Sequence, residues 1–157
     1  MWRRNQIMDL KSFLVKAKIN TYASAGEGGE KVLEDGGREF VYKESEWAYR
    51  DRYFGFNPFI GQEVVLANDI MIWGMNYYGR ILSPNVDSKQ LYGFLMQSLR
   101  LVSSERPFRG PDKFQKEEWV YVNESQGNTD NFNGIETIFL KNKKVYELRY
   151  HGGVIGK

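Results

Sequence analysis

One histidine, His151, is a candidate for acid–base chemistry, and it is the only histidine in the sequence. Histidine is the residue type that most readily exchanges a proton near neutral pH. Gly152 and Gly153 follow it, and glycines let a ligand approach the backbone closely. His151 is therefore a candidate general base or ligand contact. The alternative is a histidine at a strand end, whose ring bonds a neighbouring backbone carbonyl.

Two glutamates, Glu63 and Glu136, occupy matching places in a repeated pattern. Gly61-Gln62-Glu63-Val64-Val65 recurs as Gly134-Ile135-Glu136-Thr137-Ile138. If a twofold axis relates the two copies, both carboxylates face it, and paired carboxylates can serve as acid and base. An enzyme that uses His151 with Glu63 or Glu136 is thus one hypothesis. The alternative places both glutamates in solvent, where they discourage pairing between sheet edges.

Arg109 and a polar group around Asn76 are the next candidates. Arg109 lies between Pro107 and Pro111 in a stiff turn. Its guanidinium suits a carboxylate or phosphate of a ligand, or an ion pair inside the fold. Asn76, Tyr77 and Tyr78 follow an apolar run, which is typical of a pocket mouth. The alternative is that the two tyrosines fill the core and its rim.

Several kinds of site are excluded by composition. The chain has no cysteine, one histidine and a net charge of +2, so we expect no thiol chemistry, no metal centre and no cofactor. The glycine run at 26–29 lacks the lysine of a phosphate loop, and the sequence contains no Gly-x-Ser-x-Gly elbow. Basic and acidic residues are interleaved, which predicts no direct nucleic-acid binding. No run approaches the roughly 20 apolar residues of a membrane span.

These observations favour a non-catalytic binding or regulatory module over an enzyme. Aromatic residues make up 15% of the chain, and aromatic side chains commonly line ligand pockets. The expected ligand is a small organic molecule, with an anion as one option. The predicted contacts are Glu63, Asn76, Tyr78, Arg109 and His151. A protein-interaction or homodimerisation module, using a sheet edge or an aromatic patch, is the remaining alternative.

The elements that must position these residues occur twice along the chain. Residues 61–82 match residues 134–155 without a gap. Apolar residues at helical spacing occupy 10–17, and the same face returns at 91–99. Asp9 and Asp87 precede these two stretches and suit helix N-caps. Between the helices and the repeats, aromatic residues alternate with polar ones, as expected for strands. The matched pair Trp73 and Tyr146 is predicted to lie in the core.

This order predicts an α+β fold built from internally duplicated helix–strand–strand–strand units. Two helices packed on one face of a shared antiparallel sheet would bury the apolar stripes most simply. We expect a single duplicated domain over residues 8–157, with halves at about 8–83 and 84–157. Residues 1–7 are expected to be an upstream-start or disordered extension. They lack the apolar segment of a secretory signal, which predicts a cytoplasmic location.

Four short blocks together resemble an uncharacterised bacterial domain family. The blocks are Met75–Arg80, Pro107–Pro111, Tyr150–Gly153, and an opening Phe13-Leu14-x-x-Ala17 followed by Thr21-Tyr22. Some members of that family stand alone, and others follow a helix-turn-helix domain in predicted transcriptional regulators. The resemblance spans roughly residues 8–155. It implies an accessory, sensor-like domain and assigns no activity and no catalytic residue.

Overall fold

The computed structural model of the chain describes residues 9–23 and 29–156. Within these ranges the chain forms two helices and one nine-stranded antiparallel sheet. The predicted extension at residues 1–7 lies outside the described residues. No helix in the described part is long and apolar enough to cross a membrane.

Both helices begin at the aspartates that the sequence predicts as caps. Helix α1 spans Leu10–Ile19, and the Asp9 carboxylate accepts a 2.9 Å hydrogen bond from the Ser12 amide. Helix α2 spans Ser88–Leu99, and Asp87 accepts an equivalent 2.9 Å bond from the Gln90 amide. These carboxylates satisfy amides that the first helical turn leaves without partners. The two predicted helices and their caps are confirmed.

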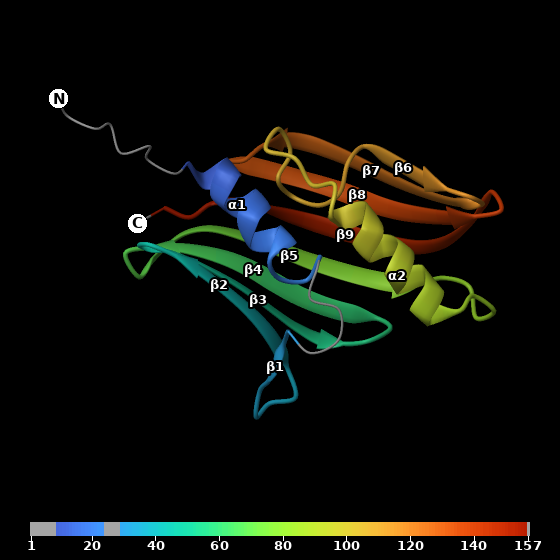
Figure 1. The fold of residues 1–157 in the computed structure, drawn as a ribbon, viewed down its shortest axis with the longest axis horizontal. Helices are drawn as coiled ribbons and strands as arrows, with labels where there is room; N and C mark the ends of the chain where they lie inside the picture. Colours follow the sequence, from blue (N-terminus) through green and yellow to red (C-terminus); the bar gives the residue numbers. More distant parts are fainter. Residues whose placement is uncertain (1–8, 24–28, 157) are drawn as a thin grey trace.

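The strands form two meanders that meet in the middle of the sheet. The sheet order is β1-β2-β3-β4-β5-β9-β8-β7-β6, so β5 and β9 form the central pair. Figure 1 shows this order from the helix side, with β9 lying beside β5. The bounds are β1 Lys31–Val32, β2 Arg38–Glu44, β3 Trp47–Gly55, β4 Phe59–Ala67, β5 Ile70–Ile81, β6 Lys113–Lys116, β7 Trp119–Asn128, β8 Asn131–Leu140 and β9 Lys143–Val154.

The predicted α+β class is wrong, because the described chain is a mostly-β protein. Strands make up 52% of it and helices only 15%. The first helix is followed by five strands and the second by four, where the sequence pattern predicted three in each half. The two helices contain only 10 and 12 residues, whereas the sheet has nine strands, the longest of 12 residues. The fold is therefore a single large sheet with a small helical cover.

The repeated sequence has a repeated strand register. Glu63 pairs with Met75 between β4 and β5, and Glu136 pairs with Leu148 between β8 and β9. A β-bulge interrupts each of these ladders two residues beyond its glutamate, after Val65 in the first and after Ile138 in the second. The central β5–β9 ladder is symmetric about one pair, Tyr77 and Tyr150. The two meanders are thus arranged about a local twofold at this tyrosine pair.

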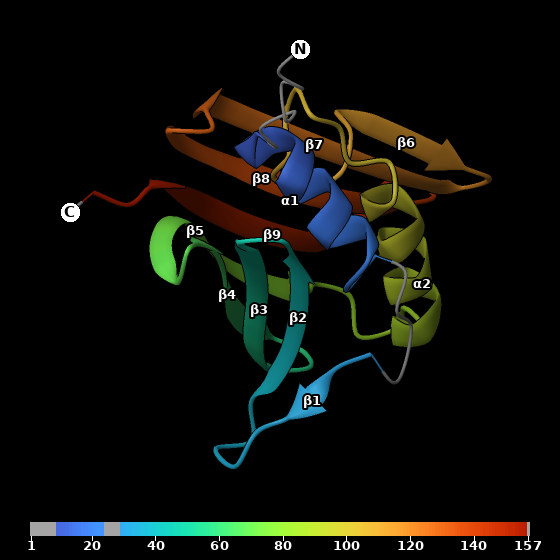
Figure 2. The same ribbon diagram turned by 60° about the vertical axis from the view of Figure 1, so that its left-hand side comes forward.

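The helices cover one face of the sheet and form the core with it, as Figures 1 and 2 show. Phe13 of α1 packs its ring against Trp47 at 5.3 Å, and Phe94 of α2 packs against Trp119 at 5.5 Å. Trp73 and Tyr146 are fully buried, which confirms them as core residues. The opposite face carries alternate residues of the same strands. We call it the open face.

Candidate functional site

The five predicted ligand contacts lie on two different faces of the sheet. Glu63 and Arg109 are buried under the helices, at 0% and 5% exposure. Asn76, Tyr78 and His151 are exposed on the open face. The parity of each strand explains the split, because neighbouring residues of a strand point to opposite faces. The structure therefore brings Asn76, Tyr78 and His151 together on one face and separates them from Glu63 and Arg109, which belong to the core.

Glu63 accepts the hydrogen bonds of a buried polar cluster in the first half. Lys18 of α1 reaches both of its carboxylate oxygens, at 3.0 and 3.1 Å, and donates a 2.6 Å bond to the Phe108 carbonyl. The Tyr49 hydroxyl also donates to Glu63. Burial lowers the pKa of Lys18, and the adjacent Glu63 carboxylate opposes that shift. This cluster satisfies the charges that the helix and sheet bury.

Glu136 holds the corresponding cluster in the second half. Arg109 binds its carboxylate with two parallel bonds of 2.9 and 3.0 Å. Tyr121 donates to it at 2.6 Å and Tyr146 at 3.1 Å. The structure therefore uses Arg109 for an ion pair inside the fold, one of its two predicted roles. Lys18 and Arg109 come from different kinds of segment, so no sequence repeat could have revealed that each serves one glutamate.

Asp51 and Asn123 are buried polar residues of the core to which the sequence analysis assigned no role. Tyr77 donates a 2.6 Å hydrogen bond to Asp51, and Tyr150 donates a 2.7 Å bond to Asn123. Burial, together with the nearby Glu63 carboxylate, raises the pKa of Asp51 to about 7. Both residues follow a repeated Trp-x-Tyr-x motif. That motif was the available signal for this pair.

His151 is separated from the buried carboxylates by the sheet itself. It is exposed on β9, paired in register with Asn76 and Asn133. Across residues 9–23 and 29–156, no hydrogen bond or ion pair joins it to a carboxylate. The same described residues contain no group of three His, Cys, Asp or Glu side chains placed to hold a metal ion. The geometry does not support an acid–base pair between His151 and Glu63 or Glu136.

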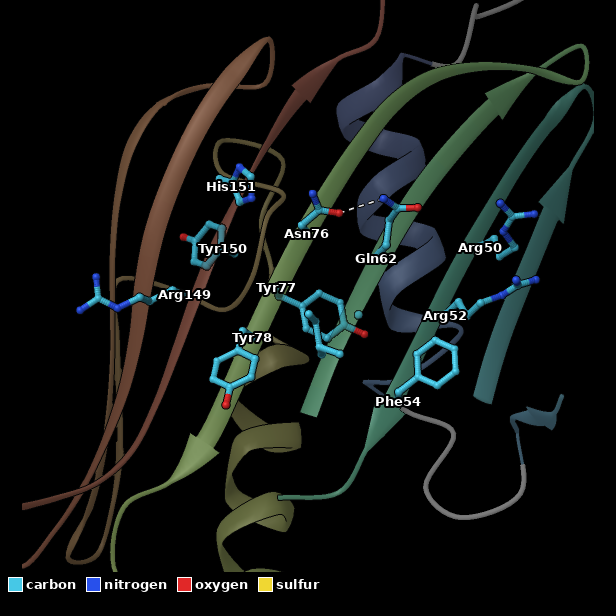
Figure 3. A pocket seen from close by; sticks show the side chains of 12 residues that line it. Arg50, Arg52, Phe54, Gln62, Asn76, Tyr77, Tyr78, Arg149, Tyr150 and His151 are labelled. Atoms are coloured by element: carbon cyan, nitrogen blue, oxygen red, sulfur yellow. Dashed lines mark hydrogen bonds between the residues drawn. The ribbon is translucent and has the colours of Figure 1, made fainter. Parts of the chain in front are cut away.

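A hollow of about 670 Å³ lies on the open face over β3, β4, β5 and β9, and we call it the groove. Figure 3 looks onto the groove, with the helices behind the strands. The residues that line it are Arg50, Arg52, Phe54, Ile60, Gly61, Gln62, Asn76, Tyr77, Tyr78, Arg149, Tyr150 and His151. Three of the predicted contacts thus lie in one concave site. Most of the other lining residues were missed by the sequence analysis.

Strand register arranges the groove residues in two rows. In one row Phe54 pairs with Ile60, Ile60 with Tyr78, and Tyr78 with Arg149. This row is apolar over its first three positions.

In the next row Arg52 pairs with Gln62, Gln62 with Asn76, and Asn76 with His151. Gln62 donates a 2.9 Å bond to Asn76, which fixes the two amides side by side. An apolar row and a polar row therefore run next to each other across the groove.

The charge of the groove is positive. Arg50, Arg52 and Arg149 line it, and none of its described lining residues is Asp or Glu. Arg52 is engaged at 2.8 Å with Glu39 outside the groove, and Arg50 lies 3.9 Å from the same carboxylate. Among the described residues Arg149 has no carboxylate within 4.0 Å. Its guanidinium is therefore free of ion pairs within the described part of the chain, and in Figure 3 it points away from β5, at the edge of the groove.

The second half has a different surface at the equivalent positions. A hollow of about 520 Å³ lies there over β7 and β8. By register, Arg52 faces Gln62 in the first half, and Glu124 faces Ile135 in the second. Likewise Phe54 faces Ile60, and Gln126 faces Asn133. The arginine and the phenylalanine that β3 contributes to the groove thus have no counterpart at the matching positions of β7.

The fold and the site define a mostly-β protein with one helix-covered face and one open, grooved face. The chain belongs to the family described as a domain of unknown function, DUF5680, which matches residues 51–155. This confirms the expected membership of an uncharacterised domain family. The bacterial origin and the association with helix-turn-helix regulators stay predictions. No curated protein and no solved structure matches the chain.

Proposed function

We propose that this protein is a non-catalytic binding module whose groove on the open face takes a small organic anion. The observation that carries the proposal is the basic, carboxylate-free lining of the groove, in which Arg149 has no internal ion pair within the described residues. An arginine fork is well suited to a carboxylate or phosphate. The groove volume of about 670 Å³ also falls within the usual range for small-molecule sites.

The comparison between the two halves supports a ligand role for the groove. Buried positions repeat closely, as Tyr49 and Tyr121 do, or Glu63 and Glu136, because the same packing problem occurs twice. The open-face positions do not repeat. Packing alone places no demand for arginine and phenylalanine on an exposed face, so their presence in one half favours a ligand over a structural role.

A binding role fits the geometry better than catalysis does. The carboxylates that could act as acid or base are fully hydrogen-bonded and lie on the helix side of the sheet. His151 lies in the groove with amides and arginines as neighbours. Such a set can hold and orient an anion, since all of these groups offer hydrogen-bond donors. A regulatory role would follow if ligand binding altered contacts with another protein segment.

Thermal-shift measurements test the proposal directly. Small carboxylates and phosphates would be screened against the full chain, each beside its neutral amide or alcohol analogue. We expect some anions to raise the melting temperature, because a ligand that binds only the native state stabilises it, by about 2.7 kcal/mol at a hundredfold excess over Kd. The neutral analogues should give no shift.

Two arginine variants provide the matched control. Arg149→Gln should abolish the shift, whereas Arg80→Gln should preserve it, because Arg80 lies on the same face of β5 and is already paired with Glu147 at 2.9 Å. Both substitutions remove one positive charge. Equal loss in the two variants would point to nonspecific attraction, and an undiminished shift in Arg149→Gln would contradict the proposed site.

A further inference from the structure

The groove contains an apolar shelf made of Phe54, Ile60 and Tyr78. These side chains are 40%, 54% and 48% exposed, although each is large and hydrophobic. They lie side by side on three neighbouring strands, because Phe54 pairs with Ile60 and Ile60 with Tyr78. Exposed apolar residues that gather in one place commonly mark a binding surface. Figure 3 shows the rings of Phe54 and Tyr78 at the two ends of this shelf.

The spacing of the shelf suits a flat ring. Neighbouring strands are about 4.8 Å apart, so Phe54 and Tyr78 stand about 10 Å apart with Ile60 between them. A planar ligand can rest on Ile60 and meet an aromatic ring at each side. Aromatic rings gain attraction from such offset or edge contacts beyond the effect of apolar area. In an open groove, where one side of the ligand stays in water, these lateral contacts matter more than enclosure does.

The groups at the rim specify what the ring must carry. Arg149 pairs directly with Tyr78, so its position on β9 is about 5 Å beyond the shelf. Along the other side run Gln62 and Asn76, whose mutual bond leaves the Gln62 carbonyl oxygen and the Asn76 amide free for a ligand. His151 adds a polar ring beside Asn76. A flat ligand on the shelf thus has amides along one side and a cation beyond Tyr78 at the end of the row.

We infer that the groove selects a planar aromatic ring that bears an anionic group, an aryl carboxylate or aryl phosphate. The ring lies on Ile60 and reaches over Tyr78, and the anionic group binds the Arg149 guanidinium once this exposed side chain turns from its position in Figure 3 toward the groove. This inference rests on the proposed function and names the chemical class of its ligand. It separates the groove from a general anion site, because the shelf and the free arginine must be engaged together.

Three probes of one carbon skeleton test the inference on the full chain. They are naphthoate, its saturated counterpart decahydronaphthoate, and the neutral naphthamide. Backbone amide shifts would be followed by NMR during titration, and each Kd extracted. Naphthoate should move the amides near Ile60, Tyr78 and Arg149 and bind about tenfold tighter than either other probe. A purely hydrophobic surface would instead prefer decahydronaphthoate, which offers more apolar area.

The outcomes distinguish the inference from the proposed function. Equal or tighter binding of decahydronaphthoate, with naphthamide still weak, would overturn the aromatic preference and leave the anion site standing. Naphthamide binding as tightly as naphthoate, or binding by none of the probes, would overturn both. Shifts confined to residues outside the groove would overturn both as well.

Variants of the shelf supply a second, independent readout. Phe54→Leu and Tyr78→Leu should bring the ratio of the naphthoate and decahydronaphthoate Kd values to about one. Phe56→Leu is the control, because Phe56 is 65% exposed and packs on Tyr92 of α2, away from the shelf. Both shelf variants keep an apolar side chain at a partly exposed position. An unchanged ratio in both would place the ring elsewhere and refute the inference.

Discussion

At the scale of single residues, the repeated tyrosine contacts differ by one atom type. Tyr77 donates to a carboxylate, Asp51, where Tyr150 donates to an amide, Asn123. Both acceptors are almost fully buried, at 4% and 3% exposure. The second half therefore shows that an amide can occupy this position and keep the hydrogen bond. The carboxylate carries an additional cost, because it lies near the buried Glu63.

The first prediction concerns Asp51→Asn. In the native protein the pKa of Asp51 rises from 3.8 to about 7, so between these values only the native state binds the proton. Stability of the wild type should then fall as pH rises through this window, by at most about 1.4 kcal/mol per pH unit. Asp51→Asn should remove that slope. We expect similar urea midpoints at about pH 3.5, below both pKa values, and a variant about 1–3 kcal/mol more stable at pH 8.

The reciprocal change, Asn123→Asp, is the control. It places a buried carboxylate in the second half, beside Glu136, and Glu136 itself is 0% exposed. The same physics then predicts a new loss of stability between acidic and mildly basic pH. Urea unfolding across pH would measure both variants together. A pH profile of Asp51→Asn that parallels the wild type would show that Asp51 does not titrate in this window.

At the scale of the strands, two glycines admit the central tyrosines. A Cβ atom at Gly61 would lie 2.2 Å from the Tyr77 hydroxyl, and one at Gly134 would lie 2.2 Å from the same atom of Tyr150. Each tyrosine thus crosses directly over the glycine of the neighbouring strand. Only glycine leaves enough space for the ring at each position. The ring cannot easily move aside, because Asp51 or Asn123 holds the tyrosine hydroxyl.

The second prediction compares Gly61→Ala with Gly93→Ala. Alanine at Gly61 must displace a buried ring, and overpacking of this kind typically costs about 1–3 kcal/mol. Gly93 lies inside α2, and a Cβ there meets nothing within 4 Å. Alanine should stabilise that helix by about 0.5–1 kcal/mol. Chemical denaturation of both variants would check the opposite signs, and a neutral Gly61→Ala would argue against the close tyrosine packing.

The same strands show what the sequence could and could not predict. Local signals were sufficient for the capped helices and for Trp73 and Tyr146 in the core, because caps and period-two alternation depend on neighbouring residues. Burial of Glu63 was not predictable in this way. A glutamate in a strand is expected in solvent, and the cation that offsets its buried charge, Lys18, lies 45 positions away in the sequence. Long-range pairing also decided which face each candidate residue occupies.

The candidate site was predictable only in part for the same reason. Trp73 in the core implies that Tyr77, on the same strand parity, faces inward and that Asn76 and Tyr78 face outward. The sequence could also have placed Glu63 on the opposite face from these two residues, but only if the face that Glu63 occupies on its own strand had been known. The contribution of Arg52 and Arg149 could not be predicted without the order of the strands. β3 and β9 are far apart in the sequence, and they line one groove because β4 and β5 lie between them in the sheet.

At the scale of the whole molecule, contacts between the halves join them into one core. Lys18 of the first half donates to the Phe108 carbonyl of the second. Trp73 donates a 3.1 Å bond to the Thr129 carbonyl, and its ring stacks on Phe132 at 5.6 Å. The β5–β9 ladder adds a continuous run of paired residues between the halves. We therefore expect the two halves to unfold as a single cooperative unit.

The third prediction tests that cooperativity with Phe132→Leu. Phe132 is 2% exposed and belongs to the second half, so its truncation should cost about 1–2 kcal/mol. If the halves unfold together, hydrogen exchange should accelerate equally in β3 and β7, although β3 does not contain the change. Mass spectrometry of peptides from both strands measures this, with Phe56→Leu as an exposed control. Acceleration confined to β7 and β8 would mean that each repeat opens by itself, and the groove, whose walls come from β3 and β9, could then change shape without global unfolding.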